Sequence, residues 1–415
     1  MEGERASGSV LHVSGFRSLL GSSLAAAVGG SISSVAVNWL VYHYTGSTLD
    51  VAYVGLAGIV PGIALGLLAG VFADRYNRRR LMITSDLVRM TVMAILATAL
   101  YLTGFSLFLV LGVMTLVYSF TALFTPASQA ILPRLVPVEQ LESANGILAA
   151  LAQTGSTVGA AAGGLVVVFA GAFIGLGLNA ATYALSAIFL FQIASELGRP
   201  RPSAEAAPRG FRREFSEGIS YMRTHRPVLE VTFGFLPGNF LLTMVIAFFV
   251  VYAATVFGGD AAAYGYLVAG LAGGSAVGAL LVPRLRARRF AGLLMGACVT
   301  AQAGGIGLLV VSRTLATSLA AAIGIGLCIG LINTVYFATM QAIVPNEVLA
   351  RVLSIDSVGA FAAIPGGLLV GGLLAARYGI LFTYTLGGVG LLVNGLVLLA
   401  LPDVRSLRYG GRPSP

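Results

Sequence analysis

The stretch "GVFADRYNRRR", residues 70–80, concentrates charge in a chain that otherwise carries little of it. One carboxylate, Asp74, and four arginines lie within seven positions, although only 10% of the 415 residues are charged. Apolar sequence runs into this stretch from Val51 and leaves it from Leu81. A charged connector between two long apolar segments is typical of a chain that crosses a membrane several times.

The composition supports a membrane protein. Hydrophobic residues make up 57% of the chain and the mean hydropathy is +0.91, whereas soluble domains average about 45–50% apolar and about 25% charged residues. Within lipid, backbone polar groups must be satisfied inside helices or closed barrels. The apolar runs are long and unbroken, not alternating strands of about ten residues, so the sequence favours helices.

Twelve segments reach the length of about 20 residues that a transmembrane helix needs. The predicted spans are residues 16–44, 50–73, 79–102, 105–130, 142–170, 173–195, 226–257, 262–283, 290–312, 316–342, 350–376 and 380–401. The first is too long for a cleaved signal peptide, so we interpret it as a retained span. The one long connector is rich in Pro and Arg, and we expect a short amphipathic helix in it near residues 210–223.

The basic residues predict the topology. All 25 are arginine, and they lie mostly in short connectors, which argues against nucleic-acid binding. If both ends are cytoplasmic, 22 of them lie inside, Arg89 falls within the third span, and only Arg313 and Arg377 lie outside. The positive-inside rule therefore predicts a multi-pass protein of the cell membrane with cytoplasmic N- and C-termini.

The chain repeats itself. "QAILP" at 129–133 returns as "QAIVP" at 341–345, and Gly155 and Gly159 return at the same offset of 212 as Gly367 and Gly371. We expect an all-α integral membrane fold with twelve transmembrane helices in two pseudo-symmetric six-helix bundles. The predicted parts are an N-terminal bundle (1–195), a cytoplasmic linker (196–225), and a C-terminal bundle with a short tail (226–415). The glycine faces either pack helices statically or form a seam along which the bundles move.

The opening stretch resembles a family signature. "GVFADRYNRRR" is similar to the G-x-x-x-D-R-x-G-R-R motif between helices two and three of the major facilitator superfamily, with Asn77 where glycine is usual. The stretches "DRYNRRRLMITSDLVR" and "NWLVYHYTGS" (38–47) look more like one branch, the macrolide-efflux and enterobactin exporters. This resemblance implies a secondary active transporter, not an enzyme, that exports small amphiphilic compounds by alternating access.

The resemblance also implies a cytoplasmic gate. Its residues would be Gly70, Asp74, Arg75, Arg78 and Arg79, with Asp356 at the start of the eleventh span as their partner. Asp356 could instead make only a helix-dipole contact. Asp86 and Arg89 are three residues apart on the third span, so they form either a local ion pair or part of this gate.

Polar and aromatic residues within the first, fourth, seventh and tenth spans predict a substrate cavity, because ligand sites are mostly apolar with a few polar groups. They are Asn38, Trp39, Tyr42, Tyr118, Asn239, Phe240, Asn333 and Tyr336. Taken singly, each is also explained by helix packing. A cavity without central charge suits an amphiphilic or neutral small molecule.

The energy source is predicted by exclusion. The chain contains no lysine and hence no G-x-x-x-x-G-K-[ST] nucleotide loop, so we expect no cofactor and coupling to an ion gradient, most simply protons. Spans one, four, seven and ten lack a central carboxylate, which leaves the coupling residue unassigned. Span four lacks the arginine of many related antiporters, and Ala160 replaces an expected proline, so transport is better supported than antiport.

The expected partners are a small-molecule substrate, the lipid bilayer and a coupling proton, with no nucleic acid, and the protein is expected to act as a monomer. Alternatives are a carrier for solute uptake or lysophospholipid flipping, and a non-transporting membrane sensor or scaffold. The sensor reading requires a recognition domain in a loop, and no loop exceeds about 33 residues.

Overall fold

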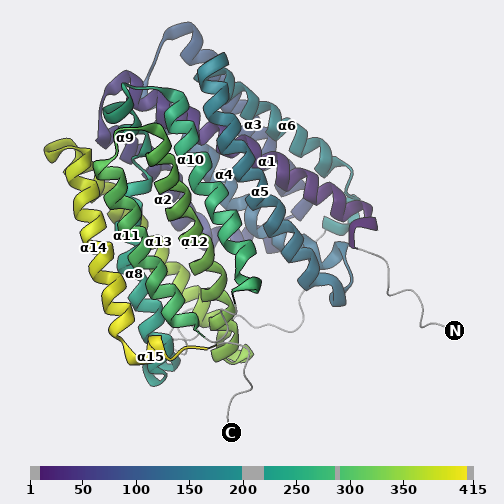
Figure 1. Ribbon diagram of the computed structural model, residues 1–415. Helices are drawn as coiled ribbons and strands as arrows, with labels where there is room; N and C mark the ends of the chain where they lie inside the picture. Colours follow the sequence, from purple (N-terminus) through teal and green to yellow (C-terminus); the bar gives the residue numbers. More distant parts are fainter. Residues whose placement is uncertain (1–9, 199–218, 286–289, 409–415) are drawn as a thin grey trace. The chain divides into compact units, whose positions relative to one another are not determined.

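The computed structural model describes residues 10–198, 219–285 and 290–408, and long α-helices dominate these ranges (Figure 1). Twelve long helical segments match the twelve predicted spans when α8 and α9 are taken as one. Their bounds are α1 Ser14–Thr45, α2 Thr48–Arg75, α3 Arg78–Thr103, α4 Leu107–Leu135, α5 Leu141–Ala170, α6 Ala172–Phe191, α8 Arg226–Ile246, α9 Phe249–Phe257, α10 Ala261–Leu281, α11 Ala291–Val311, α12 Leu315–Ile343, α13 Asn346–Tyr378 and α14 Ile380–Ala400.

These helices suit a bilayer. Within the described residues, ten helices are long and apolar enough to cross a membrane, and two shorter apolar helical stretches, Thr48–Gly62 and Ala362–Tyr378, lie in α2 and α13. The remaining short elements are η1 Val10–His12, η2 Val138–Gln140, η3 Ser195–Gly198, η4 Val282–Arg284 and α15 Pro402–Arg405. The fold is therefore all-α and integral to the membrane, as predicted.

Local sequence sets the sharp turns between helices. Gly46 adopts a left-handed conformation (φ 61°), and its N–H donates to the Tyr42 carbonyl at 2.8 Å, which ends α1. Glycine is favoured there because a Cβ atom penalises positive φ. Asp260 begins α10, where its side chain accepts the Ala262 N–H at 2.8 Å as an N-cap. Connectors of two or three residues are enough to reverse the chain.

The chain divides into two compact units. Unit 1 contains the residues up to Gly46 and those from Leu56 into the central linker, and unit 2 contains Ser47–Gly55 together with the C-terminal half. The first turns of α2 thus group with unit 2, where the Thr48 hydroxyl donates to the Gly372 carbonyl at 2.9 Å.

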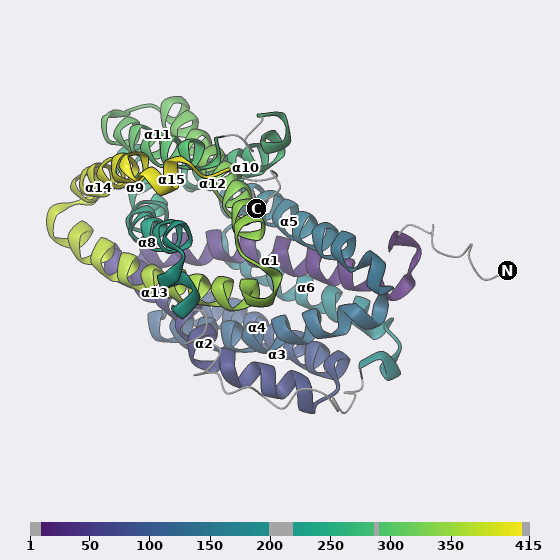
Figure 2. The ribbon, with the colours of Figure 1, turned by 90° about the horizontal axis from the view of Figure 1, so that it is seen from below.

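Four pairs of neighbouring helices recur in the two units. In unit 1, α1 packs against α5 and α6, and α3 packs against α4 and α6. In unit 2, α8 packs against α13 and α14, and α11 packs against α12 and α14. Figure 2 views the same helices from another side. Replacing each helix by the one six spans later converts one pattern into the other, which confirms the two pseudo-symmetric bundles.

The repeated glycines lie at helix contacts inside the units. A Cβ atom added at Gly159 of α5 would lie 2.9 Å from Cα of Val28 on α1. The equivalent Gly371 of α13 would place one 3.1 Å from Cα of Met244 on α8. These contacts support the static-packing interpretation, in which small residues let backbones approach closely.

One predicted span is broken. The segment predicted at 226–257 forms α8 and α9, separated at Ala247 and Phe248. Tyr384 of α14 donates its hydroxyl to the Val245 carbonyl at 2.9 Å, close to the break. The Val245 carbonyl also accepts the Phe248 N–H at 3.2 Å, so backbone hydrogen bonding continues across the break and Tyr384 adds a contact from α14. Arg226–Phe257 still counts as one candidate membrane span, so the predicted span is confirmed, with a two-residue break in its helix that the sequence did not predict.

Two further expectations concern helix ends. The eleventh predicted span starts at 350, but α13 begins at Asn346, so Asp356 lies three turns into the helix. The alternative of a helix-dipole contact for Asp356 is therefore wrong, and its assignment to the gate stays a prediction. The amphipathic helix expected near 210–223 lies largely outside the described residues, and residues 219–224 are helical.

Candidate functional site

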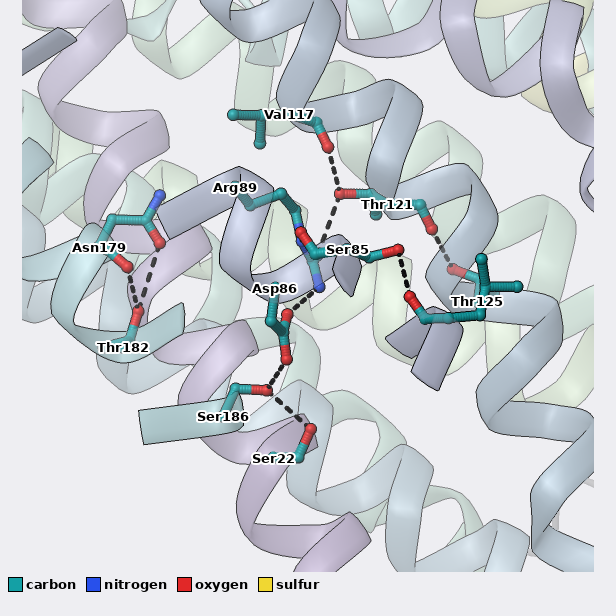
Figure 3. A network of polar contacts seen from close by, with 11 residues as sticks. Ser22, Ser85, Asp86, Arg89, Val117, Thr121, Thr125, Asn179, Thr182 and Ser186 are labelled. Carbon is teal, nitrogen blue, oxygen red and sulfur yellow. Dashed lines mark hydrogen bonds and ion pairs between the residues drawn. The ribbon is translucent and has the colours of Figure 1, made fainter. Parts of the chain in front are cut away.

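A buried polar network lies among the helices of unit 1 (Figure 3). Asp86 on α3 is fully buried, and its carboxylate accepts hydrogen bonds from Arg89 Nη2 and, at 2.6 Å, from Ser186 Oγ on α6. The Ser186 hydroxyl lies 2.8 Å from the Ser22 hydroxyl on α1. Because Ser186 gives its one proton to Asp86, Ser22 is the donor in that pair.

The Arg89 guanidinium is enclosed on several sides. It donates to the Ser85 carbonyl at 3.3 Å and to the Thr121 hydroxyl of α4 at 3.2 Å. Its central carbon lies 4.7 Å from the ring centroid of Phe124 and 4.5 Å from that of Tyr183. Aromatic faces attract a desolvated cation. The network thus ties α1, α3, α4 and α6 together around one buried charge pair.

The spacing of Asp86 and Arg89 gave the correct local pairing, because residues three apart share a helix face. Ser22, Ser186, Thr121 and Tyr183 were not predicted. Single hydroxyl residues are frequent in transmembrane helices and bond readily to their own backbone, so no sequence pattern separates these four from the others. The part of Asp86 and Arg89 in a gate stays a prediction.

The arginines of the opening stretch bind the ends of neighbouring helices. Arg78 donates to the Ala130 carbonyl of α4 at 2.8 Å. Arg79 donates to the Leu190 carbonyl at 3.1 Å and to the Phe191 carbonyl at 2.7 Å, at the end of α6. Cations are favourable at helix C-termini, where carbonyls lack partners within the helix. These side chains therefore have a structural contact in addition to any role in gating.

Asn77, which stands where the motif usually has glycine, makes two structural contacts with its side chain. Its side-chain oxygen accepts the Arg80 N–H at 3.1 Å, which caps the start of α3, and its side-chain nitrogen donates to the Ser195 carbonyl at 3.1 Å. Asparagine is among the best N-cap residues. The residue in the usual glycine position thus joins α3 to the segment after α6.

The other gate residues of unit 1 are less defined. Gly70 and Asp74 lie on α2, but the surroundings of these two residues are outside what the structure describes. Arg75 is exposed at the end of α2. The proposed cluster of Asp74 with the arginines consequently stays a prediction.

Two residues assigned to different predicted sites meet in unit 2. Tyr336 of α12, predicted for the cavity, donates its hydroxyl to Asp356 of α13, predicted for the gate, at 2.6 Å. Phe235 of α8 packs edge-on against Tyr336, with ring centroids 5.7 Å apart. A charge-assisted bond of this length is strong, so α12 and α13 are joined at this point.

The remaining cavity residues are placed within their own units. In unit 1, Asn38 donates to the Ser34 carbonyl of its own helix at 2.9 Å, and the Trp39 ring stacks on His43 at 4.4 Å. Tyr42 is half-buried. Tyr118 is 37% exposed and faces Gly58, where an added Cβ atom would lie 3.2 Å from its ring.

In unit 2, Asn239 and Asn333 are exposed. Phe240 contacts α13, because a Cβ atom added at Gly366 would lie 3.1 Å from its ring. No group of three or more potential metal ligands occurs within the described ranges. The shared cavity stays a prediction.

Comparison with known proteins identifies the class. The family model described as transmembrane secretion effector, a major facilitator family, matches residues 7–408. The multidrug efflux pump Tap of Mycolicibacterium fortuitum is 26% identical over 408 residues, which cover 95% of this chain and 97% of Tap. Macrolide efflux protein A of Streptococcus pyogenes is 25% identical over 389 residues, covering 92% and 94%.

Solved structures agree at the level of fold. A bacterial homologue of the human lysosomal transporter Spinster has a TM-score of 0.71 at 16% identity and covers 98% of this chain and 100% of its own. A POT family transporter in complex with 5-aminolevulinic acid has a TM-score of 0.72 at 12% identity, covering 94% and 96%.

The fold and these matches define a multi-pass membrane transporter of the major facilitator type. The chain belongs to the transmembrane secretion effector family, and the resemblance to the macrolide-efflux branch is confirmed. The two relatives named above are a multidrug efflux pump and a macrolide efflux protein.

Proposed function

We propose that the protein is a secondary active exporter of small amphiphilic compounds in the cell membrane. The observation that carries this proposal is the similarity to two efflux proteins over more than nine tenths of the chain. One of these proteins is a multidrug efflux pump and the other is a macrolide efflux protein. An amphiphilic substrate also fits predicted cavity residues that include no charged side chain.

Alternating access requires bundles that move as rigid bodies. Unit 1 supports this property through the network of Asp86 and Arg89, which joins four helices. Unit 2 supports it through close glycine contacts, such as Gly274 and Gly278 of α10 against the backbone of α12. We propose that the charged cluster of Asp74, Arg75, Arg78 and Arg79 latches one state on the cytoplasmic side, with Asp356 as its partner.

We propose a proton as the coupling ion. Among the described residues, Asp86 and Asp356 are carboxylates inside long helices and hydrogen-bonded to neighbouring helices. Glu230 of α8 has one buried carboxylate oxygen without a hydrogen-bond partner. Ionisable groups at membrane depth are costly and usually functional, so these three are the candidates to test for proton uptake.

The decisive experiment is transport into inside-out vesicles that contain the protein. Uptake of a macrolide and of lipophilic fluorescent dyes is measured with an acidic lumen, with and without a protonophore. We expect accumulation that collapses when the gradient is dissipated. Substrate flux that is unchanged by the protonophore contradicts proton coupling. Accumulation of substrate only in right-side-out vesicles favours the uptake alternative.

The cavity is tested with asparagine variants. Asn38→Ala and Asn333→Ala are expected to raise KM for the exported compound. Asn145→Ala is the matched control, because Asn145 is exposed on α5 and makes the same bond to its own helix, at 2.9 Å, that Asn38 makes. Unchanged kinetics in both cavity variants would refute the assignment.

The gate is tested with Asp74→Asn. We expect normal expression with impaired transport, because the charge is lost while the side-chain shape is kept. Loss of expression would indicate a folding role instead. Cysteine accessibility mapping of residues 75–80 tests the orientation, and labelling from the outside of cells would contradict cytoplasmic termini.

A further inference from the structure

An apolar cavity lies between α11 and α14 of unit 2. Its volume is about 400 Å³, within the range of about 300–1,000 Å³ for small-molecule sites. The floor is formed by buried Ala303, Tyr384 and Gly388, while Gly304, Gly307 and Val389 at the rim are exposed. The cavity therefore opens on the outer surface of two membrane-spanning helices.

Glycine creates the space. Cβ atoms added at Gly304 or Gly307 of α11 would meet nothing within 4 Å. At Gly388 of α14, an added Cβ atom would lie 3.2 Å from the Ile306 side chain, so the two helices are close there. The helices are therefore in contact at Gly388 and leave a hollow beside it that side chains do not fill.

The lining offers little hydrogen bonding. Thr300 donates to Gly296 at 3.0 Å, Thr385 donates to Leu381 at 2.8 Å, and the Tyr384 hydroxyl donates to Val245 at 2.9 Å. Each hydroxyl proton in the lining is therefore used inside the protein. An occupant of the cavity must be apolar where it meets these walls.

The end of the cavity carries a cation. Val310 and Val311 line this end, and Arg313 lies two residues beyond Val311, after the C-cap residue Ser312. The exposed Arg313 uses Nη1 to donate to the Val310 carbonyl at 3.2 Å and to the Ser312 carbonyl at 2.9 Å. These bonds hold the guanidinium beside the cavity with Nε and Nη2 available, and guanidinium groups bind phosphate well.

Aromatic residues mark the same end as interfacial. Tyr378, just before α14, and Phe382, in its first turn, have ring centroids 5.0 Å apart and are both exposed. Such residues concentrate at the level of lipid headgroups. The cavity is apolar along its length and has a cation and aromatic rings at one end. A phospholipid has the matching arrangement, with apolar acyl chains and a polar phosphate headgroup at one end.

We propose that this cavity is a binding site for an anionic phospholipid, with an acyl chain between α11 and α14 and the phosphate beside Arg313. The site is separate from the transport pathway proposed above and does not depend on the direction of flux. A bound chain would fill the hollow beside Gly304 and Gly307 and complete the packing of α11 against α14.

The test uses the full-length protein in bilayers containing phosphatidylglycerol with a photoactivatable diazirine near the acyl-chain end. After illumination, labelled peptides are identified by mass spectrometry. We expect adducts concentrated on residues 300–311 and 384–392. Equal labelling of other exposed helix faces, such as that around Ile323 of α12, would overturn the proposal.

Variants make the assignment specific. Gly307→Leu or Gly304→Leu should lower labelling of the site about tenfold. This is the loss of affinity expected when a leucine side chain displaces a few atoms of an apolar ligand from the cavity. Gly324→Leu on α12 is the matched control, since its added Cβ atom also meets nothing within 4 Å. Both cavity variants are checked for monodispersity, and undiminished labelling in either folded variant contradicts the site.

The headgroup contact is tested separately. Arg313→Gln should reduce labelling by phosphatidylglycerol, while labelling by a diacylglycerol probe with the same chains and no phosphate stays the same. Equal labelling by phosphatidylglycerol in the variant would remove the phosphate from the proposal. Displacement of the probe by a transported macrolide would assign the cavity to substrate and overturn the lipid assignment.

Discussion

The helix pair α3–α6 of unit 1 and its counterpart α11–α14 of unit 2 occupy equivalent places in the repeat but are joined differently. In unit 1 the buried charge of Asp86 is bonded to Ser186 of α6. In unit 2, Gly395 of α14 approaches Thr300 of α11 so closely that an added Cβ atom would lie 2.8 Å from its backbone nitrogen. Polar bonding and small-residue packing are two solutions to the same problem.

The problem is helix association in lipid. Apolar side chains gain little by leaving lipid for a helix interface, so association depends on packing and hydrogen bonds. The α3–α6 pair is joined by a hydrogen bond from Ser186 to the charge pair of Asp86 and Arg89. Loss of either charged residue leaves the other buried without its partner. The α11–α14 pair uses backbone proximity at one end and leaves the hollow near Gly304 at the other. Unfolding of the two units can be followed separately. Trp39, the only tryptophan, is in unit 1, and both cysteines, which are buried, are in unit 2.

The largest effect is expected from Asp86→Ala. Removing one member of a buried ion pair leaves an uncompensated charge and costs about 3–5 kcal/mol of unfolding free energy. Unfolding in detergent is followed by Trp39 fluorescence. The double variant Asp86→Leu, Arg89→Met removes both charges and should recover most of the loss. Equal loss in single and double variants would show that the pair itself is not the source of stability.

A smaller effect is expected from Gly395→Val in unit 2. The added side chain forces α14 away from the Thr300 backbone, and overpacking of this kind costs about 1–3 kcal/mol. Reaction of Cys298 and Cys328 with a thiol dye during heating reports unfolding of unit 2. Gly324→Val, at an open helix surface, is the control and should be nearly neutral. Similar loss in both variants would indicate a general cost of β-branching.

Ser22→Ala should have a modest effect in unit 1. It removes the outermost hydrogen bond of the network and should cost about 0.5–1.5 kcal/mol. Ser119→Ala is the comparison, because the half-buried Ser119 donates to the Thr115 carbonyl of its own helix at 2.7 Å. An Asp86→Ala background should abolish the difference between the two serines, whereas an additive loss would contradict a connected network.

The smallest effect is expected from Gly304→Ala. Its Cβ atom enters open space, and alanine in place of helical glycine contributes up to about 0.5–1 kcal/mol of stability. Gly388→Ala places a methyl group 3.2 Å from Ile306 and should offset that gain. Melting followed by a thiol dye measures the difference in stability between the two variants. Equal stability of the two would contradict the presence of a hollow beside Gly304.

Much of the fold was predictable, because the requirement that each span be apolar and helical leaves few alternatives in lipid. The repeats of Gly155 and Gly159 at Gly367 and Gly371 also located equivalent helices. The break at Ala247 was not predictable, since neither glycine nor proline occupies residues 247–248 and the carbonyl bond near the break comes from the distant Tyr384.

The candidate site was less predictable. The spacing of Asp86 and Arg89 predicted their pairing, but their partners on α1, α4 and α6 come from segments up to 100 residues away. Asn77 counted only as a departure from a motif until its two side-chain bonds were seen. Tyr336 and Asp356 were assigned to separate sites, although a single hydrogen bond joins them.

The sequence by itself determined the twelve apolar segments, the internal duplication and the membership of a transporter superfamily, because hydropathy and repeats are properties of the chain read in order. Only the tertiary structure decided which buried polar groups are satisfied and where two helices leave a hollow. Those properties depend on side chains from distant segments meeting within a few ångströms, and in lipid each such meeting must satisfy the hydrogen bonds that water would otherwise supply.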